Sequence, residues 1–199
     1  MLAETHTAPH PPCPAPFNLA AHVLAHADDT PDKVALAILR LSGAERWSYA
    51  RLKQAVLGTG TGLLQTGLKP GDRVLMRLGN TVEFPIAYLG AIAVGLVPVP
   101  TSSQLTAPEV ERMIAMLNPA VILLGPGIAC PETDVPIIEQ PALEEMRDLP
   151  PAQWDMGEPD RMAYIIYTSA TSGVPRAVCH AHRAIWARQM MIGGWSGLQ

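Results

Sequence analysis

Apolar residues along the chain change their spacing repeatedly between the period of a helix and the period of a strand. Leu19, Val23, Leu24 and Ala27 recur at helical spacing, which predicts a helix within residues 17–29. The expected strands lie at 34–39, 45–48, 73–78, 97–101, 120–124, 135–140 and 161–167. Further helices are expected at 49–68, about 82–94, about 107–117 and 142–149.

The long helix expected after residue 48 has clear start and stop signals. Ser48 is a good N-cap residue, and the helical spacing of the apolar positions predicts a buried stripe. The segment KPGD at 69–72 then predicts a turn before the next strand. The stripe consists of Leu52, Val56, Leu63 and Leu64.

Helices that alternate with uninterrupted apolar strands favour an α/β fold, with a mostly parallel sheet covered by helices on both faces. The stretch from 84 to 100 carries no charge, but it is 17 residues long and contains Pro85, Pro98 and Pro100. A bilayer needs about 20 apolar residues for a spanning helix. We therefore expect a buried helix followed by a buried strand, and no membrane span.

Composition narrows the possible partners. The chain has 199 residues, of which 48% are hydrophobic and 16% charged, which is typical of a globular protein. The net charge is −4 and no run of Lys and Arg occurs, so nucleic acid and anionic membranes are not expected as partners. Three distant cysteines, Cys13, Cys130 and Cys179, are typical of reduced thiols in a cytoplasmic protein.

The first 16 residues differ from the rest of the chain. Five of the eight residues from 9 to 16 are prolines, which disfavours both helix and ladder. We expect a disordered tail at 1–16 and a folded domain at 17–199. No internal repeat is visible.

Two motifs can be set aside. The segment GTGTGLLQTG at 58–67 resembles a dinucleotide-binding fingerprint, but Gln65 stands where glycine is needed and the segment lies in a helical pattern. Its small residues predict close helix packing instead. His180 and His182 would diverge on a helix, and on a strand they lack a third ligand nearby in the sequence, so no metal site is expected.

A patch of small hydroxyl residues follows the strand at 161–167, with the sequence TSATSGVPR. A polyphosphate needs hydroxyl and backbone N–H donors, small side chains that allow close approach, and a cation. We expect this loop to lie between the strand and a helix. It is not a Walker loop, because GK[ST] is absent. Composition alone leaves a flexible Ser/Thr linker as an equal alternative. The candidate binding residues are Thr168, Ser169, Ala170, Thr171, Ser172, Gly173 and Arg176.

The full stretch YTSATSGVPRAVCHAHR resembles the phosphate-binding signature of the AMP-forming adenylating enzymes, which include acyl-CoA synthetases, nonribosomal-peptide adenylation domains and luciferases. The stretches LKPGDRVLMRLGN and FPIAYLGAIAVGLVPVPTSSQLT also resemble this family, so the similarity covers nearly all of 17–199. The variant PRAVCHAHRA is most similar to ligases of aromatic acids such as benzoate. Matches to the signature fall at positions 167–169, 171, 173, 175, 178 and 182.

The resemblance implies that a carboxylic acid reacts with ATP and Mg²⁺ to give an acyl-adenylate, which is then transferred to coenzyme A. It implies that the hydroxyls of Thr168, Ser169, Thr171 and Ser172 bind phosphate oxygens, with Arg176 in place of the usual lysine. It also implies an N-terminal portion of a longer enzyme, with catalytic residues beyond 199. The 199 residues alone are therefore expected to be inactive.

Two departures from the signature concern the loop. Ala170 replaces a glycine, and we expect the loop to tolerate it; Ala177 replaces a second glycine at the loop's exit. Transfer to a carrier protein and a non-catalytic binding or assembly module remain alternatives to coenzyme A ligation, and self-association stays open.

Overall fold

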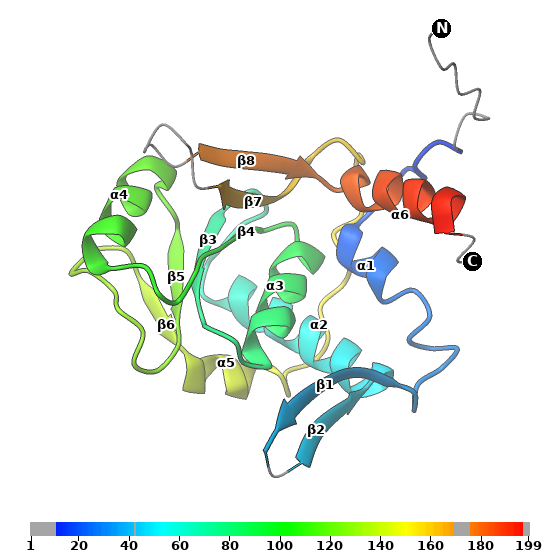
Figure 1. The fold of residues 1–199 in the computed structure, drawn as a ribbon, viewed down its shortest axis with the longest axis horizontal. Coiled ribbons are helices and arrows are strands. Elements are labelled where there is room, and N and C mark those ends of the chain that lie inside the picture. Colours follow the sequence, from blue (N-terminus) through cyan, green and yellow to red (C-terminus); the bar gives the residue numbers. More distant parts are fainter. Residues whose placement is uncertain (1–10, 42, 169–175, 197–199) are drawn as a thin grey trace, which may run out of the picture.

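Helices and strands alternate along most of the chain (Figure 1). The structure is a computed structural model that describes residues 11–41, 43–168 and 176–196. Its elements are α1 (Leu19–Val23), β1 (Val34–Arg40), β2 (Gly43–Ser48), α2 (Tyr49–Gln65), β3 (Arg73–Arg77), α3 (Glu83–Ala93), β4 (Val97–Pro100), α4 (Ala107–Leu117), β5 (Val121–Leu124), β6 (Ile137–Glu139), α5 (Gln140–Met146), β7 (Met162–Thr168), β8 (Arg176–Ala181) and α6 (Arg183–Ser196).

A parallel sheet with the strand order β4-β3-β5-β6 forms the centre. Because side chains alternate along β3, Val74 and Met76 face α2, α3 and α5, whereas Leu75 faces α4 and β7. These three side chains have no exposed surface. The expected α/β fold with a parallel sheet covered on both faces is confirmed.

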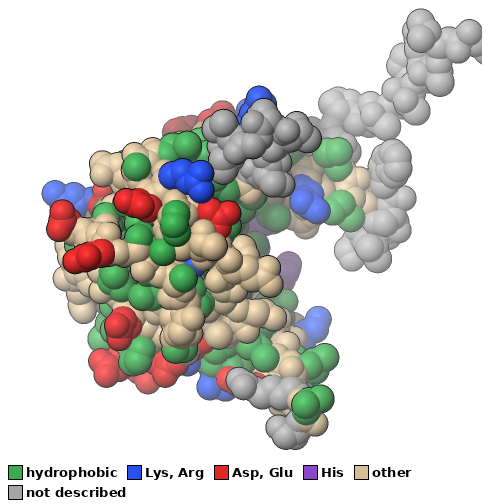
Figure 2. All heavy atoms as spheres, turned by 60° about the vertical axis from the view of Figure 1, so that its left-hand side comes forward, with side chains coloured by type: hydrophobic (Ala, Val, Ile, Leu, Met, Phe, Trp, Pro, Cys, Tyr) green, Lys and Arg blue, Asp and Glu red, His purple; other side chains and the backbone are tan. Residues whose placement is uncertain are grey.

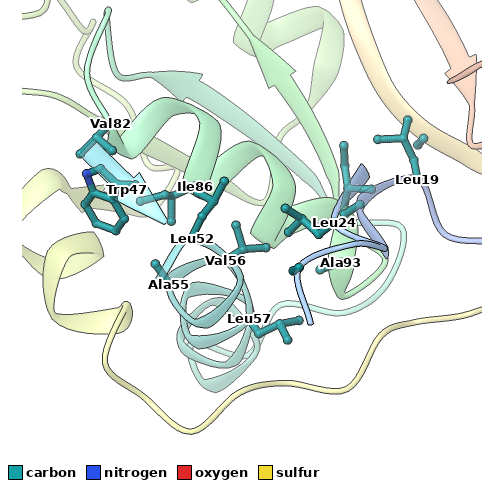
Figure 3. Close-up of a cluster of buried hydrophobic side chains, with 14 residues drawn as sticks. Leu19, Leu24, Trp47, Leu52, Ala55, Val56, Leu57, Val82, Ile86 and Ala93 are labelled. Atoms are coloured by element: carbon teal, nitrogen blue, oxygen red, sulfur yellow. The ribbon is translucent and has the colours of Figure 1, made fainter. Parts of the chain in front are cut away.

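Helix α2 begins where the sequence predicts it. The Ser48 side chain accepts a hydrogen bond from the amide of Arg51, which satisfies one donor of the first turn. Leu52 and Val56 then enter a core shared with Trp47 and Ile86, as Figure 3 shows. Leu64 differs from its prediction, because its side chain is 38% exposed.

Small residues let α2 approach its neighbours closely, as the GTGTG segment predicts. A Cβ atom at Gly60 would lie 2.7 Å from a methyl of Val94, and one at Gly90 would lie 2.8 Å from the carbonyl oxygen of Val56. Gly58 lies just as close to the backbone after α5. These contacts explain the glycines without any nucleotide.

The first helix is much shorter than expected. Asn18 caps α1 by accepting hydrogen bonds from the amides of Ala20 and Ala21, but the helix ends at Val23. Val23 is 44% exposed, so it does not belong to the buried face with Leu19. The chain continues in turns rather than in helical geometry to residue 29.

A hairpin of β7 and β8 crosses the molecule from the side of α4 to the side of α6 (Figure 1). Ile165 of β7 packs with Val97 and Val99 of β4, yet the hairpin is not part of the parallel ladder. The amides of Val97 and Thr101 point toward β3, so the intervening Pro98 and Pro100 face away from it. Proline has no N–H, and the free side of β4 therefore lacks these ladder donors.

Charged side chains are spread over the face of the molecule seen in Figure 2. On the face seen in Figure 2, basic groups stand singly among acidic, polar and hydrophobic ones. Within the described residues, no helix is both long enough and apolar enough to cross a membrane.

Candidate functional site

The hydroxyl-rich loop connects the two strands of the β7–β8 hairpin. Thr168, the last residue of β7, is the register partner of Arg176, the first residue of β8. Directly opposed residues of antiparallel strands have Cα atoms about 5 Å apart, so the two ends of the loop are held together. Ser169, Ala170, Thr171, Ser172 and Gly173 lie outside the described residues.

The expectation that a helix follows this loop directly is wrong. β8 comes first, and α6 begins only at Arg183. The residues of β8 form a short extended run that pairs with β7 from Arg176 to Ala181. A loop between two antiparallel strands has both ends fixed by one ladder, whereas a strand–loop–helix unit would present a helix N-terminus to the ligand.

Arg176 is exposed at the start of β8 and is the guanidinium next to the loop. Arg77, by contrast, is fully buried at the end of β3. Its guanidinium donates to the carbonyl oxygens of Ala129, Ser102 and Leu105, at 2.6, 2.5 and 3.1 Å. Burial lowers the pKa of Arg77. Its guanidinium donors bind backbone carbonyl oxygens, so Arg77 holds neighbouring loops together.

Aromatic rings stiffen one face of the hairpin. The ring of Tyr164 stacks on that of His180, with centroids 4.6 Å apart and planes 11° from parallel. Tyr88 of α3 lies 5.8 Å from Tyr164. Burial raises the pKa of both tyrosines, which keeps the phenols protonated at neutral pH. The tyrosines therefore fit packing better than proton transfer.

His180 and His182 have separate environments. His182 is 1% exposed, and its Nδ1 atom accepts a hydrogen bond from the Leu19 amide at 3.0 Å. Burial and the nearby Arg161 guanidinium lower the pKa of His182 to about 4, although Asp155 acts in the opposite direction. Among the described residues, no group of three or more His, Cys, Asp or Glu side chains is placed to hold a metal ion.

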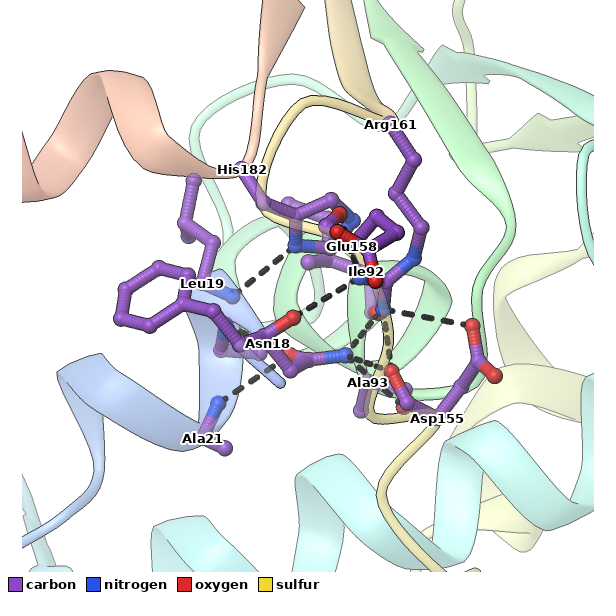
Figure 4. Close-up of polar contacts among 11 residues, drawn as sticks. Asn18, Leu19, Ala21, Ile92, Ala93, Asp155, Glu158, Arg161 and His182 are labelled. Carbon is purple, nitrogen blue, oxygen red and sulfur yellow. Dashed lines mark hydrogen bonds and ion pairs between the residues drawn. The ribbon is translucent and has the colours of Figure 1, made fainter. Parts of the chain in front are cut away.

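A polar cluster at the base of the hairpin was not expected from the sequence (Figure 4). Arg161 precedes β7, and its Nη1 atom donates to the Phe17 carbonyl oxygen at 2.8 Å, while Nη2 donates to the Asp155 backbone. The Asn18 amide donates to the carbonyl oxygens of Ile92 and Asp155, at 3.0 and 2.9 Å. These bonds join the N-terminal segment, α3 and the start of β7.

Only part of this cluster had a signal in the sequence. Asn before a helical pattern is a recognisable N-cap, so the local role of Asn18 could have been found. Its partners lie 74 and 137 positions away, and no spacing rule connects them. From the sequence, Arg161 is only a charged residue before a predicted strand.

Helix α6 packs on the same N-terminal segment. The ring of Trp186 lies 6.4 Å from that of Phe17 and 5.6 Å from that of His22, both edge to face. The Trp186 Nε1 atom donates to the Pro11 carbonyl oxygen at 3.0 Å. The base of the hairpin and α6 thus both contact the N-terminal segment. The domain boundary at residue 16 stays a prediction.

Comparison with known proteins agrees with the signature. The chain is 30% identical over 158 residues to the 4-hydroxybenzoate–CoA/benzoate–CoA ligase of Rhodopseudomonas palustris, which covers 68% of this chain and 28% of that protein. It is 28% identical over 177 residues to enterobactin synthase component F of Escherichia coli, which covers 87% of this chain and 13% of that protein.

The fold also matches a solved structure. The crystal structure of a fatty acyl-adenylate ligase from L. pneumophila, in complex with acyl adenylate and pyrophosphate, superposes with a TM-score of 0.77 at 22% identity. The match covers 92% of this chain and 33% of that one. The chain thus spans about a third or less of the length of these proteins. The family model described as AMP-binding enzyme matches residues 23–196, and the chain belongs to this family.

Proposed function

We propose that this chain is the phosphate-binding part of an acid–thiol ligase that uses ATP. The observation that carries the proposal is the pairing of Thr168 with Arg176, which brings the ends of the hydroxyl-rich loop together beside an exposed guanidinium. A closed loop with hydroxyl, backbone N–H and guanidinium donors suits a polyphosphate.

The proposed reaction has two steps. A carboxylate oxygen attacks the α-phosphorus of ATP, and the bond to the bridging oxygen breaks to release pyrophosphate. The thiol sulfur of coenzyme A then attacks the acyl carbon, AMP leaves, and the thiol proton is lost to solvent. Mg²⁺ would accompany ATP and offset part of the triphosphate charge.

The loop residues act on the leaving pyrophosphate. Thr168, Ser169, Thr171 and Ser172 supply hydroxyl donors to the β- and γ-phosphate oxygens, and Ala170 and Gly173 supply backbone N–H groups. Arg176 supplies a permanent positive charge and two parallel N–H donors. As charge builds on the leaving group, these groups stabilise it electrostatically, and no proton transfer by the loop is needed.

A screen of carboxylic acids for pyrophosphate release by the intact protein tests the proposal. Release that requires both ATP and one class of acid is the expected result. Absence of release, together with absence of ATP binding, would contradict the proposal. The 199 residues alone are expected to show no carboxylate-dependent exchange of pyrophosphate into ATP, because they span 28% of the ligase from R. palustris.

A carrier-protein thiol is the second candidate acceptor. The similarity to enterobactin synthase component F keeps this acceptor open, since not every relative of the chain is named as a coenzyme A ligase. Comparing thioester formation with free coenzyme A and with a phosphopantetheinylated carrier protein distinguishes the two acceptors. We further propose a cytoplasmic location, because Cys13, Cys130 and Cys179 are free thiols.

A further inference from the structure

The base of the β7–β8 hairpin is tied to the N-terminal segment at two points. Arg161, just before β7, donates to the Phe17 carbonyl oxygen at 2.8 Å. His182, just after β8, accepts the Leu19 amide hydrogen at 3.0 Å. The two are also joined to each other, because the His182 amide donates to the Arg161 carbonyl oxygen at 3.1 Å. Figure 4 shows both side chains directed toward the start of α1.

This attachment matters because, in the described part of the chain, β7 and β8 form a sheet of their own and are not strands of the parallel sheet. A two-stranded hairpin is marginally stable alone, and β7 and β8 pair only with each other in the described sheets. Pro98 and Pro100 give the free side of β4 no ladder donors, so Ile165 contacts the sheet through apolar packing. Apolar packing is non-directional and sets position along a strand less strictly than hydrogen bonds do.

The chemistry of His182 fits a fixed acceptor. The Leu19 amide can only donate, so Nδ1 must be unprotonated and Nε2 must carry the ring hydrogen. The ring faces Arg161 and Asp155, and it is 1% exposed. An imidazolium there would present a second donor to the Leu19 amide and a second cation to Arg161. The neutral ring is therefore the form that holds the N-terminal segment.

We propose that His182 is a positioning residue, which anchors the hairpin to α1 and thereby places the paired loop ends, Thr168 and Arg176, for binding of a nucleotide polyphosphate. The inference rests on the function proposed above. β8 has six residues, about 20 Å of extended chain, so His182 acts through the strand and does not touch the ligand.

Three variants separate positioning from ordinary stability. His182→Ala removes the acceptor and leaves the Leu19 amide buried without a partner. His182→Asn places an amide oxygen where Nδ1 stands, so it restores the acceptor. Leu143→Ala is the control, because Leu143 is 2% exposed in α5, packs with α2 and α3, and also costs stability on truncation.

Two readouts are measured on the intact protein at a temperature where every variant is folded by circular dichroism. The hydrogen-exchange rates of the β7 and β8 amides report how firmly the hairpin is attached. Titration with ATP and with AMP reports the affinity of the loop for the outer phosphates. His182→Ala should speed hydrogen exchange in the hairpin about tenfold. It should also weaken the binding of ATP about tenfold, which is about 1.4 kcal/mol. AMP affinity should change less, and His182→Asn should recover most of both effects. Leu143→Ala should change neither.

Hairpin exchange that rises equally in the His182→Ala and Leu143→Ala variants would overturn the anchoring role. Faster exchange with unchanged ATP affinity would overturn the positioning role, as would failure of His182→Asn to recover ATP affinity. If the wild-type protein does not bind ATP, the proposed function and the positioning role fail together, and the exchange data still decide whether His182 anchors the hairpin.

Discussion

Gly58→Ala and Gly62→Ala place the same methyl group on the same helix, but their effects on stability should differ. At Gly58, the new Cβ would lie 2.5 Å from the Arg147 carbonyl oxygen and 2.8 Å from that of Met146. That backbone has little room to retreat, because Leu143 is buried and the Arg147 side chain pairs with the buried Glu83. At Gly62, the three nearest atoms to the new Cβ would be the Cβ, Cγ and Sδ atoms of the half-buried Met146. The Cγ and Sδ atoms can turn away with the flexible side chain, but the Met146 Cβ atom, at 2.8 Å, cannot.

Overpacking costs about 1–3 kcal/mol, and Gly→Ala in a helix returns about 1 kcal/mol. Both substitutions gain the helix term and both overpack, but only Gly58→Ala meets two backbone oxygens, so it should be the less stable of the two by about 1 kcal/mol, and Gly62→Ala should not exceed the wild type. For a chain of this size each kcal/mol moves Tm by about 2–4 °C. Thermal and urea unfolding followed by far-UV circular dichroism measure the gap. Equal stabilities, or a lower Tm for Gly62→Ala, would refute the close packing of α2 against the backbone after α5.

Three further predictions concern single side chains. The pKa of His182 is lowered to about 4 in the folded protein, so as the pH falls the unfolded chain takes up the proton first. The stability present above about pH 6.5 should therefore be lost between pH 6.5 and 4, by at most about 1.4 kcal/mol per pH unit. In urea unfolding measured across this range, His182→Asn should flatten the dependence of stability on pH. Arg77→Met should lower the unfolding free energy by about 3 kcal/mol, because several buried carbonyls lose their donor, and Arg77→Lys should recover only part of it in the same urea titration. Ala170→Gly should change ATP affinity less than tenfold by calorimetric titration, and a larger gain would show that alanine impairs the loop.

The parallel sheet was predictable because its signals are local. Buried parallel strands appear as uninterrupted apolar runs, and the helix predicted at about 107–117 agrees with α4. The short α1 was not predictable in the same way. Apolar spacing continues past Val23 to Leu24 and Ala27, and both of these side chains are buried although the chain there runs in turns, so the spacing does not mark where the helix ends.

The architecture around the candidate loop was not predictable from the sequence, and the binding chemistry of the loop stays a prediction. Hydroxyls, glycine and arginine in one short segment indicate a polyphosphate loop whichever element follows. The strand β8 forms by pairing with β7, which the sequence around it does not encode locally. Side chains of β8 such as Val178 are exposed, so no clear alternation of buried and exposed positions marks the strand. The base of the hairpin was missed because Asn18 and Arg161 bind backbone carbonyls far away in the sequence, and the sequence carries no record of such contacts.

The proposed role of the loop between Thr168 and Arg176 is to bind the outer phosphates of ATP. Arg176→Ala and Arg176→Lys, titrated with ATP and with AMP in the intact protein, test it most directly, since AMP lacks the β- and γ-phosphates. A charge-assisted hydrogen bond contributes about 1.5–3 kcal/mol. Arg176→Ala should therefore lower the affinity for ATP at least about tenfold and leave the affinity for AMP nearly unchanged. Arg176→Lys should have an intermediate affinity for ATP. Equal ATP affinity in Arg176→Ala and wild type, or an equal loss for ATP and AMP, would contradict the account.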